Sequence, residues 1–304
     1  MTNSFFTGRR VLVTGASGFI GRNLCNELKR NGAEIYAVST KERKNSDIIC
    51  KWFHGDLTNY SFTESTLKCA KPSIIFHLAG FVTGQRDLDI VQPAYHNNLT
   101  STVNMLVAAT RIGIHRLILA GSMEEPETDS EELIPVSPYA ASKWASTAYA
   151  KMFFKLYQTP VTIPRIFMVY GPGDKDFDNL IPYVIRCLIQ GENPKLTSGT
   201  RLVDWIYIDD VVEGLIKMGI TEGIEGKTVD LGTGVQFSVQ EVCKKISGLL
   251  ESKIKLDFGT LPDRPFEQVR RADLDKAEKY LGWKPQMGIN KGLEQTITWF
   301  KNME

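Results

Sequence analysis

Few cysteines and no long hydrophobic run are the first features of this sequence, and each absence excludes a class of protein. The five cysteines among its 304 residues are widely spaced and include no CxxC pair. That pattern argues against a disulfide framework or a bound metal and favours reduced thiols in the cytoplasm. The opening residues, MTNSFFTGRRVLVTG, have no long apolar core, so we expect neither a signal peptide nor a membrane span there.

An excess of either charge is also missing. The chain has 36 lysines and arginines against 35 acidic residues, with a formal net charge of +1. No broad basic face is expected, which argues against nucleic acid and anionic membranes as partners. The partner is therefore expected to be a small molecule whose charges are met locally.

Short apolar, β-branched runs alternate with helical patterns through the first half of the chain. The runs fall at residues 11–15, 34–39, 73–80, 116–122 and 161–167. This alternation predicts an α/β fold with a Rossmann-type, doubly wound parallel sheet.

A glycine-rich turn joins the first of these runs to the first helix. In VLVTGASGFIGRNLCNEL, Gly15 allows a tight turn, Gly18 lets the backbone approach a pyrophosphate, and Gly21 lets the helix pack closely on the strand. We therefore expect a dinucleotide here. The predicted contacts in this loop are Gly15, Ser17, Gly18, Phe19, Ile20 and Gly21.

The ends of the next two strands bear on the identity of the dinucleotide. An acidic residue after the second strand would hold the ribose hydroxyls of NAD, but the sequence there is VSTKERK. Hydroxyls and cations suit a 2′-phosphate, so NADP is slightly favoured over NAD, although a solvated basic loop would look the same. The expected contacts are Ser39, Thr40, Lys41 and Arg43. After the third strand, GDL offers Asp56, beside Leu57, to the adenine; a plain strand-end turn is the alternative.

The chain length favours a main domain with a smaller companion. From residue 171 the regular alternation gives way to loops, short strands and helices. We expect an NAD(P)-binding domain over residues 1–170, with a late return near 200–233. An interleaved substrate lobe would cover residues 171–199 and 234–304.

Five motifs, TGASGFIG, FHLAG, YAASK, VYGPG and LGWKP, occur in this order along nearly the whole chain. Together they resemble the extended short-chain dehydrogenase/reductase family, in its NAD(P)-dependent nucleotide-sugar epimerase, dehydratase and reductase branch. A tyrosine and a lysine four residues apart would mean little alone, because they share a helix face by geometry.

In this context the tyrosine and lysine become catalytic candidates. Tyr139 would exchange a proton with a sugar oxygen, and a nearby cation is needed because the ordinary pKa of tyrosine is near 10. Lys143 supplies that charge and, by resemblance, also contacts the nicotinamide ribose. Ser122 would donate to the same sugar oxygen and hold it in place.

The resemblance implies further contacts on both ligands. Asn98 matches a family asparagine that begins a helix, although a simple cap or a buried amide is equally compatible. Asn179 and Arg264 match residues that grip the substrate diphosphate, a task that suits the arginine fork. The remaining cofactor contacts implied by resemblance are Leu78, Ala79, Gly80 and Phe167.

The sequence also departs from the family pattern. In the sugar 4,6-dehydratases of the family that this chain resembles, an Asp-Glu pair follows the position that matches Ser122. This chain has Met123 and Glu124 there. The missing acid argues against a standard dehydratase without excluding an unusual elimination. Met168 replaces a polar residue, and two methionines suggest a less hydroxylated sugar. Arg201 is expected to reach the diphosphate if strand alternation places it on that face.

These observations predict an NAD(P)-dependent oxidoreductase acting at C4 of a nucleoside-diphosphate sugar. Reduction of a 4-keto-6-deoxy sugar is slightly favoured, with a 4-epimerase close behind and an atypical dehydratase as a further alternative. A dinucleotide-sensing regulatory protein would need only the phosphate loop. The resemblance also implies a homodimer.

Overall fold

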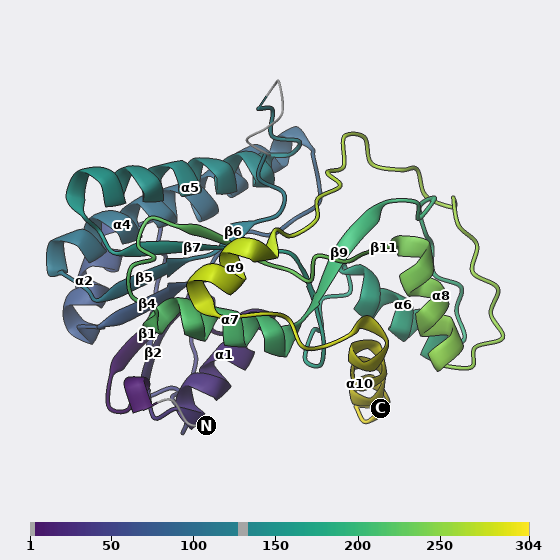
Figure 1. Ribbon diagram of the computed structural model, residues 1–304, viewed down its shortest axis with the longest axis horizontal. Helices are drawn as coiled ribbons and strands as arrows, with labels where there is room; N and C mark the ends of the chain where they lie inside the picture. The colour runs from purple at the N-terminus through teal and green to yellow at the C-terminus, as the bar shows by residue number, and fades with distance from the viewer. Residues whose placement is uncertain (1–3, 127–132, 304) are drawn as a thin grey trace.

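A twisted parallel sheet lies at the centre of the larger part of the molecule (Figure 1). The computed structural model describes residues 4–126 and 133–303. The strands follow the order β10-β7-β5-β4-β1-β2-β3, with β6 beside β7, and all of their pairings are parallel. This order reverses beside β1, as a doubly wound sheet requires, so the predicted fold class is confirmed. The strands are β1 (Arg10–Thr14), β2 (Glu34–Ser39), β3 (Lys51–His54), β4 (Ile74–His77), β5 (Arg116–Leu119), β6 (Gly121–Ser122), β7 (Val161–Ile166) and β10 (Thr228–Leu231).

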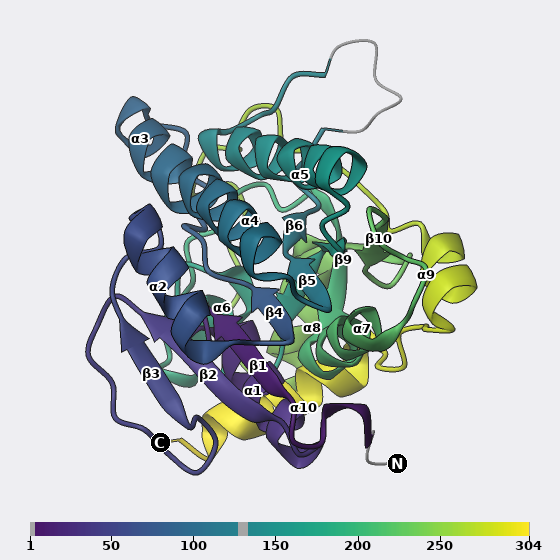
Figure 2. The same cartoon turned by 90° about the vertical axis from the view of Figure 1, so that its left-hand side faces the viewer.

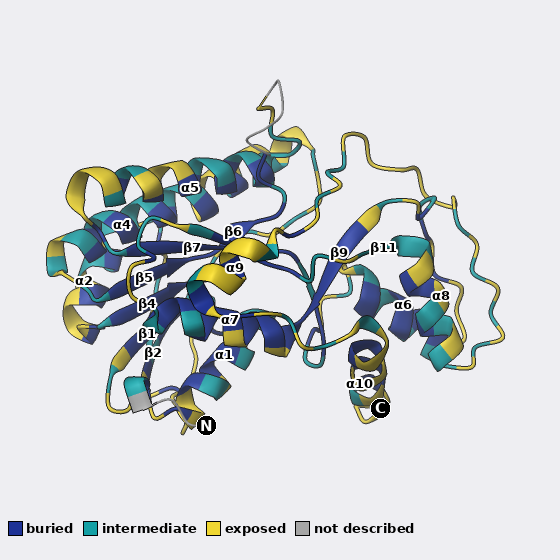
Figure 3. Cartoon of the chain, viewed as in Figure 1, coloured by how far each residue is buried: buried dark blue, intermediate teal, exposed yellow. Residues whose placement is uncertain are grey.

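Helices cover both faces of this sheet (Figure 2). On one face lie α2 (Tyr60–Ala70), α4 (Ser101–Ile112) and α5 (Pro138–Tyr157), and on the other lie α1 (Phe19–Arg30) and α7 (Ile208–Ile220). Side chains on β1 alternate accordingly: Val11 and Val13 join the hydrophobic cluster that includes α1 and α7, and Leu12 joins the cluster that includes α4 and α5. The strands are buried and the outer helix faces are exposed (Figure 3).

The helix that leads into α4 starts earlier than its hydrophobic pattern suggests. A 3₁₀ turn, η2 (Leu88–Ile90), runs into α3 (Val91–Ala94), and a π-helical segment, η3 (Tyr95–Thr100), continues directly into α4. A further 3₁₀ turn, η1 (Ser4–Phe6), precedes β1. π-Helical turns occur often at functional sites.

A smaller lobe lies beside the carboxyl ends of the large sheet (Figure 1). Its three-stranded sheet has the order β11-β9-β8 and is flanked by helices. The chain crosses between the two parts more than once, because β10 and α7 belong to the large part while β9 and β11 belong to the lobe, and α9 packs back on β10. The lobe elements are β8 (Met168–Tyr170), α6 (Leu180–Ile189), β9 (Leu202–Tyr207), β11 (Gln236–Ser238), α8 (Val239–Leu249) and α10 (Ile289–Lys301), and the returning helix is α9 (Leu274–Leu281).

Among the described residues, no helix combines the length and the apolar character needed to span a membrane.

Candidate active site

The glycine loop after β1 has the geometry of a pyrophosphate cradle. Gly15 has φ +69°, and a Cβ there would lie 2.8 Å from the Ala79 backbone nitrogen. A Cβ on Gly21 would collide with the carbonyl oxygen of Gly15, so helix α1 can pack this closely only without a side chain. Gly18 is the N-cap of α1 in an extended conformation, and its amide donates to the Gly15 carbonyl at 2.9 Å. The helix N-terminus that follows offers unpaired amides to an anion, so this loop fits a bound dinucleotide.

The remaining loop residues lie beside this cradle. Ser17, Phe19 and Ile20 are each partly exposed at the start of α1. Their backbone amides, rather than their side chains, are the groups that a pyrophosphate would contact.

The end of β4 lies against the same loop. The Thr14 hydroxyl is 2.8 Å from His77 Nδ1 and accepts from the Ala79 amide at 3.1 Å. Burial, reinforced by the charge of Lys143, lowers the pKa of His77 to about 3, so this ring is neutral at ordinary pH. Leu78 and Ala79 are partly exposed, and Gly80 is exposed. These residues thus line the loop where the cofactor was expected.

The basic loop after β2 is folded around its own serine. Ser39 Oγ accepts from the Lys41 amide at 3.1 Å and from Arg43 Nε at 3.3 Å. The Arg43 guanidinium also lies 5.5 Å from the Trp52 ring centre. Thr40 is exposed, and its carbonyl oxygen lies 2.9 Å from His54 Nε2. The loop is therefore ordered by internal contacts.

The turn after β3 is closed by its aspartate. Asp56 Oδ1 accepts from the Thr58 amide at 2.8 Å, which is the strand-end turn foreseen as an alternative. Leu57 is buried. Asp56 is exposed and keeps further acceptor capacity.

The predicted catalytic side chains converge at the carboxyl end of the sheet. Ser122 ends β6, and Tyr139 and Lys143 lie in the first turns of α5, whose N-cap Ser137 accepts from the Ala140 amide at 3.0 Å. A side-chain hydrogen bond joins Ser122 to Tyr139. These three residues thus come from two segments and meet at one point.

A break in the sheet positions the lysine. The run 116–122 was expected to be one strand, but it divides at Ala120 into β5 and β6, and β6 pairs with β7. Lys143 Nζ donates to the Ala120 carbonyl oxygen at 2.5 Å. The sequence could not predict this break, because it depends on a partner far along the chain.

Burial shifts the pKa values of Tyr139 and Lys143 in opposite directions. Desolvation raises the pKa of Tyr139 to about 12, the hydrogen bond from Ser122 opposes this, and Glu124 and Glu125 add to it. Desolvation lowers the pKa of Lys143 to about 8, and Glu125 opposes that shift. Lys143 is therefore cationic near neutral pH, while Tyr139 needs further positive charge before it can lose its proton.

Glu125 is a residue of this site that the sequence reasoning missed. It is 1% exposed, and its Oε1 accepts from the Ser122 amide at 2.8 Å. The only signal in the sequence was its position three residues after Ser122.

Asn98 lies within the π-helical segment η3 rather than at the start of a helix. Its Oδ1 accepts from the Phe81 amide at 2.6 Å, and its Nδ2 donates to the Phe81 carbonyl and to Ser142 Oγ at 3.1 and 2.9 Å. Both amide hydrogens are thus used within the protein. Asn98 thus joins the loop after β4 to helix α5, and its contact with the cofactor stays a prediction.

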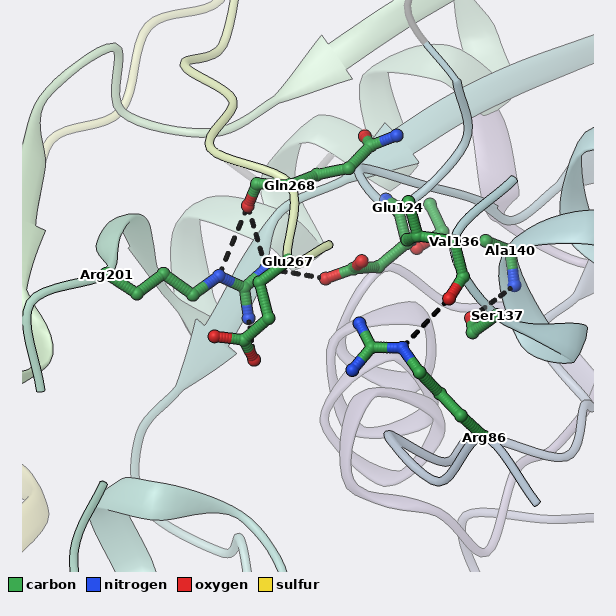
Figure 4. Close-up of polar contacts among 9 residues, drawn as sticks. Arg86, Glu124, Val136, Ser137, Ala140, Arg201, Glu267 and Gln268 are labelled. Atoms are coloured by element: carbon green, nitrogen blue, oxygen red, sulfur yellow. Dashed lines mark hydrogen bonds and ion pairs between the residues drawn. The ribbon is translucent and has the colours of Figure 1, made fainter. Parts of the chain in front are cut away.

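Figure 4 shows the ion pairs of Arg201, one of which reaches the catalytic loop, residues 122–125 at the end of β6. Arg201, just before β9, donates from Nη2 to Glu124 Oε1 at 2.8 Å and from Nη1 to Glu267 Oε1 at 3.2 Å. Its Nε and Nη2 also donate to the Gln268 carbonyl. Arg201 therefore already pairs with two carboxylates and a backbone group, and its contact with a diphosphate stays a prediction.

Arg86, another residue that the sequence reasoning missed, lies opposite these ion pairs (Figure 4). Its Nε donates to the Val136 carbonyl at 2.8 Å, next to the N-cap of α5.

The methionines and Phe167 provide the apolar part of the site. Met123 is only 3% exposed and packs in the hydrophobic core, with its amide donating to the Ile166 carbonyl at 3.1 Å. Phe167 is buried beside Gly232, where a Cβ would lie 2.9 Å from the Phe167 ring. Met168 is partly buried at the start of β8. At position 123 the structure therefore has apolar bulk where an acid would be needed for elimination.

The two predicted diphosphate ligands differ in their surroundings. Asn179 is the N-cap residue of α6, but its Nδ2 donates to Asp174 Oδ2 at 3.1 Å. Arg264 is exposed, and its guanidinium lies directly against Gly84 of the loop after β4. Arg264 and Arg201 both line a hollow of about 370 Å³ between β9 and the loop that contains Arg264. A larger hollow, about 470 Å³, lies along α10 and contains none of the motif residues, so we place the site by its chemistry.

Comparisons with known proteins identify the family of this chain. The family model described as "NAD dependent epimerase/dehydratase family" matches residues 11–232. The UDP-glucose 4-epimerase of Mycolicibacterium smegmatis is 29% identical, over 96% of this chain and 99% of its own. The dTDP-D-glucose 4,6-dehydratase of Mus musculus is 26% identical, over 96% of this chain and 89% of its own. The solved structure of MoeE5 with UDP-glucuronic acid and NAD has a TM-score of 0.87 and 27% identity, over 97% of this chain and 99% of that one. The chain is thus an enzyme of the NAD dependent epimerase/dehydratase family, within the extended short-chain dehydrogenase/reductase branch that its motifs resemble.

Proposed function

We propose that the protein is a 4-epimerase of a nucleoside-diphosphate sugar. One observation carries this choice: the oxidation–reduction residues Ser122, Tyr139 and Lys143 are assembled, whereas the elimination residues are not. Met123 is buried in the core, and Glu124 is held by Arg201. One oxygen of Glu124 thus already accepts from Arg201, so this carboxylate is not free to turn toward a C5 proton. The similarity to a UDP-glucose 4-epimerase and a UDP-glucuronate 4-epimerase is compatible with this choice.

The geometry assigns each residue a task. Ser122 and Tyr139 would hold the C4 hydroxyl between their oxygens, and Tyr139 would accept its proton. Lys143 stabilises the resulting phenolate. A bound nicotinamide would accept the C4 hydride and add the positive charge that Tyr139 requires. The reduced nicotinamide would then return the hydride to C4 on the opposite face of the 4-keto sugar, and Tyr139 would return the proton to the C4 oxygen, which inverts C4 with no net oxidation.

Isotope incorporation distinguishes the candidate reactions. The purified protein, with any cofactor that it retains plus added NAD, would be incubated in D₂O with UDP-glucose or UDP-glucuronic acid. We expect the 4-epimer to form without deuterium at C5, as followed by proton NMR. Deuterium at C5 together with a 4-keto-6-deoxy product would instead identify a dehydratase and contradict the proposal.

Reduction of a 4-keto-6-deoxy sugar is a second candidate, favoured by the basic loop after β2. Ser39, Lys41 and Arg43 gather hydroxyl and cationic groups where the adenosine ribose is expected. An NADP preference would suit net reduction. Stoichiometric consumption of NADPH by a 4-keto sugar nucleotide would favour this candidate over epimerisation.

A homodimer is also proposed. Helix α5 exposes Tyr149, Leu156 and Tyr157, which are 41%, 63% and 55% exposed, on the outside of the large part. Exposed apolar side chains on one helix suit contact with a second copy. Light scattering after size exclusion would measure the mass, and a monomer at micromolar concentration would contradict this proposal. We also propose a cytoplasmic location, because the cysteines are unpaired.

A further inference from the structure

The turn after β6 is closed by a buried carboxylate. The Glu125 amide donates to the Ser122 carbonyl at 3.1 Å, while Glu125 Oε1 accepts from the Ser122 amide at 2.8 Å. Gly121 makes room for this carboxylate, because a Cβ there would lie 2.8 Å from Glu125 Oε1. The backbone of Ser122 is thus held at two points by one residue.

A third segment fixes the same turn from outside. Arg270 Nη1 donates to the Glu125 carbonyl oxygen at 3.0 Å, and Glu125 itself is 1% exposed. The carboxylate therefore cannot leave the site without opening the contact between the catalytic loop and the C-terminal segment. Its position relative to Ser122 is fixed by the fold.

The second oxygen of this carboxylate gives the residue more than a structural task. Within residues 4–126 and 133–303, Glu125 Oε2 is buried and has no hydrogen-bond partner. A buried carboxylate oxygen without a donor is unfavourable by itself, and glutamine would provide the same acceptor for Ser122. The presence of a carboxylate is explained if its charge acts on a neighbour.

The neighbour that benefits is Lys143. Burial lowers the pKa of Lys143 to about 8, and the charge of Glu125 raises it. The other ionisable groups around the triad do not replace that charge: His77 on β4 is neutral, and Glu124 is paired with Arg201. Glu125 also raises the pKa of Tyr139, which helps that residue to hold its proton in the resting enzyme.

We propose that Glu125 is a positioning residue of the catalytic site, which fixes Ser122 through its backbone amide and contributes a negative charge to the surroundings of Lys143. The inference rests on the proposed use of Ser122, Tyr139 and Lys143. It assigns a role to a glutamate that neither the family motifs nor the sequence pattern had singled out.

The charge effect can be measured without any substrate. The full-length protein, labelled with ¹³C at the lysine ε position, would be titrated by NMR with and without NAD, and Lys143 would be assigned from its absence in Lys143→Met. In wild type we expect a midpoint of about 8. In Glu125→Gln the midpoint should fall by about half a pH unit or more, because an opposite charge has been removed. An unchanged or higher midpoint would overturn the proposed charge effect.

The matched control is Glu213→Gln, which removes a surface carboxylate that pairs with Lys217 on α7. This variant should leave the Lys143 midpoint and the turnover unchanged. A fall of the midpoint in Glu213→Gln equal to that in Glu125→Gln would mean that overall charge is responsible, and the specific role of Glu125 would be rejected.

The positioning effect is tested by a second variant. Glu125→Gln keeps an oxygen for the Ser122 amide, whereas Glu125→Ala removes it. At about pH 6.5, where Lys143 stays charged, Glu125→Ala should lower kcat by about tenfold to a hundredfold and Glu125→Gln much less. NAD affinity and the melting temperature of Glu125→Gln should match wild type, which separates this effect from misfolding.

Equal kcat losses in the two variants would refute the positioning of Ser122. The failure of this inference is distinguishable from failure of the proposed epimerisation, because the lysine titration requires no sugar nucleotide. A normal shift in Glu125→Gln with no 4-epimer formed would remove only the proposed function.

Discussion

The two sides of the candidate site are assembled by different means. On the side of the large sheet, Ser122, Tyr139 and Lys143 come from a strand end and the helix that follows it. On the side of the lobe, Arg201 binds Glu124 and Glu267, which lie 77 and 66 residues away in the sequence. The first arrangement follows from local geometry, and the second requires the whole chain to be folded.

This difference determines which groups can take part in the reaction. Local geometry brings the hydroxyls of Ser122 and Tyr139 together. On the lobe side, the Arg201 guanidinium donates to groups of the protein itself. Because Arg201 pairs with Glu124, this carboxylate is held by the lobe instead of facing the reacting sugar freely. The comparison therefore supports a reaction limited to proton and hydride exchange at C4.

Tyr139→Phe provides the strongest test of the first side. Loss of the phenol removes the general acid/base, so turnover should fall by roughly two to four orders of magnitude. The fold and NAD binding should be retained, since the hydroxyl is the only group removed. Turnover of a sugar nucleotide by the purified variant, followed by chromatography, would measure this. A rate near wild type would show that the proton moves by another route.

Arg264→Ala and Arg201→Ala sharpen the comparison on the lobe side. Arg264 is exposed and lines the hollow, so its loss should remove about 1.5–3 kcal/mol of charge-assisted contact and weaken UDP binding roughly ten- to hundredfold. Arg201 is engaged with two carboxylates, so its loss should change UDP affinity by less than about threefold while lowering the melting temperature.

Calorimetric titration of the NAD-loaded variants with UDP would measure both effects, with Arg271→Ala as a control in the same C-terminal segment. If Arg201→Ala weakens UDP binding as much as Arg264→Ala does, the internal assignment of Arg201 is wrong. If neither variant changes the affinity, the diphosphate lies elsewhere.

The sequence predicted the parts of the molecule that depend on neighbouring residues. The parallel sheet follows from its alternating runs, and the φ of +69° at Gly15 is what a glycine turn permits. The position of Glu125 in the site could not be predicted. Its carboxylate uses the space beside Gly121, and its carbonyl oxygen accepts from Arg270, which lies far along the chain. The hydrogen bond from Asn98 to Ser142 on α5 likewise joins residues that lie far apart in the sequence.

The pH dependence of turnover tests the burial of Lys143. Its pKa, lowered from the ordinary 10.5 to about 8, predicts that turnover declines as pH rises through about 8, since the cation that stabilises the Tyr139 phenolate is lost. Stability should change in the opposite direction. The unfolded lysine keeps its proton up to its ordinary value, so between these two pH values the unfolded state binds more protons and the free energy of unfolding rises with pH.

Turnover measured from about pH 6 to 10, beside urea unfolding of wild type and Lys143→Met, would test both trends. The methionine variant should lose this component of the stability increase. A constant stability difference between the two proteins across this range would contradict a lowered pKa for Lys143.

The smallest expected effect concerns the cofactor loop. Ser39, Lys41 and Arg43 favour NADPH, but Ser39 already accepts hydrogen bonds from both of the other residues. A 2′-phosphate must compete with these bonds, so we expect NADPH to bind more tightly than NADH by less than about tenfold, or about 1.4 kcal/mol. Fluorescence titration with both forms would measure the ratio, and Arg43→Ala should weaken NADPH binding more than NADH binding. Equal affinities in wild type, or tighter binding of NADH, would remove the support that this loop lends to a reductase and leave the epimerase as the sole candidate.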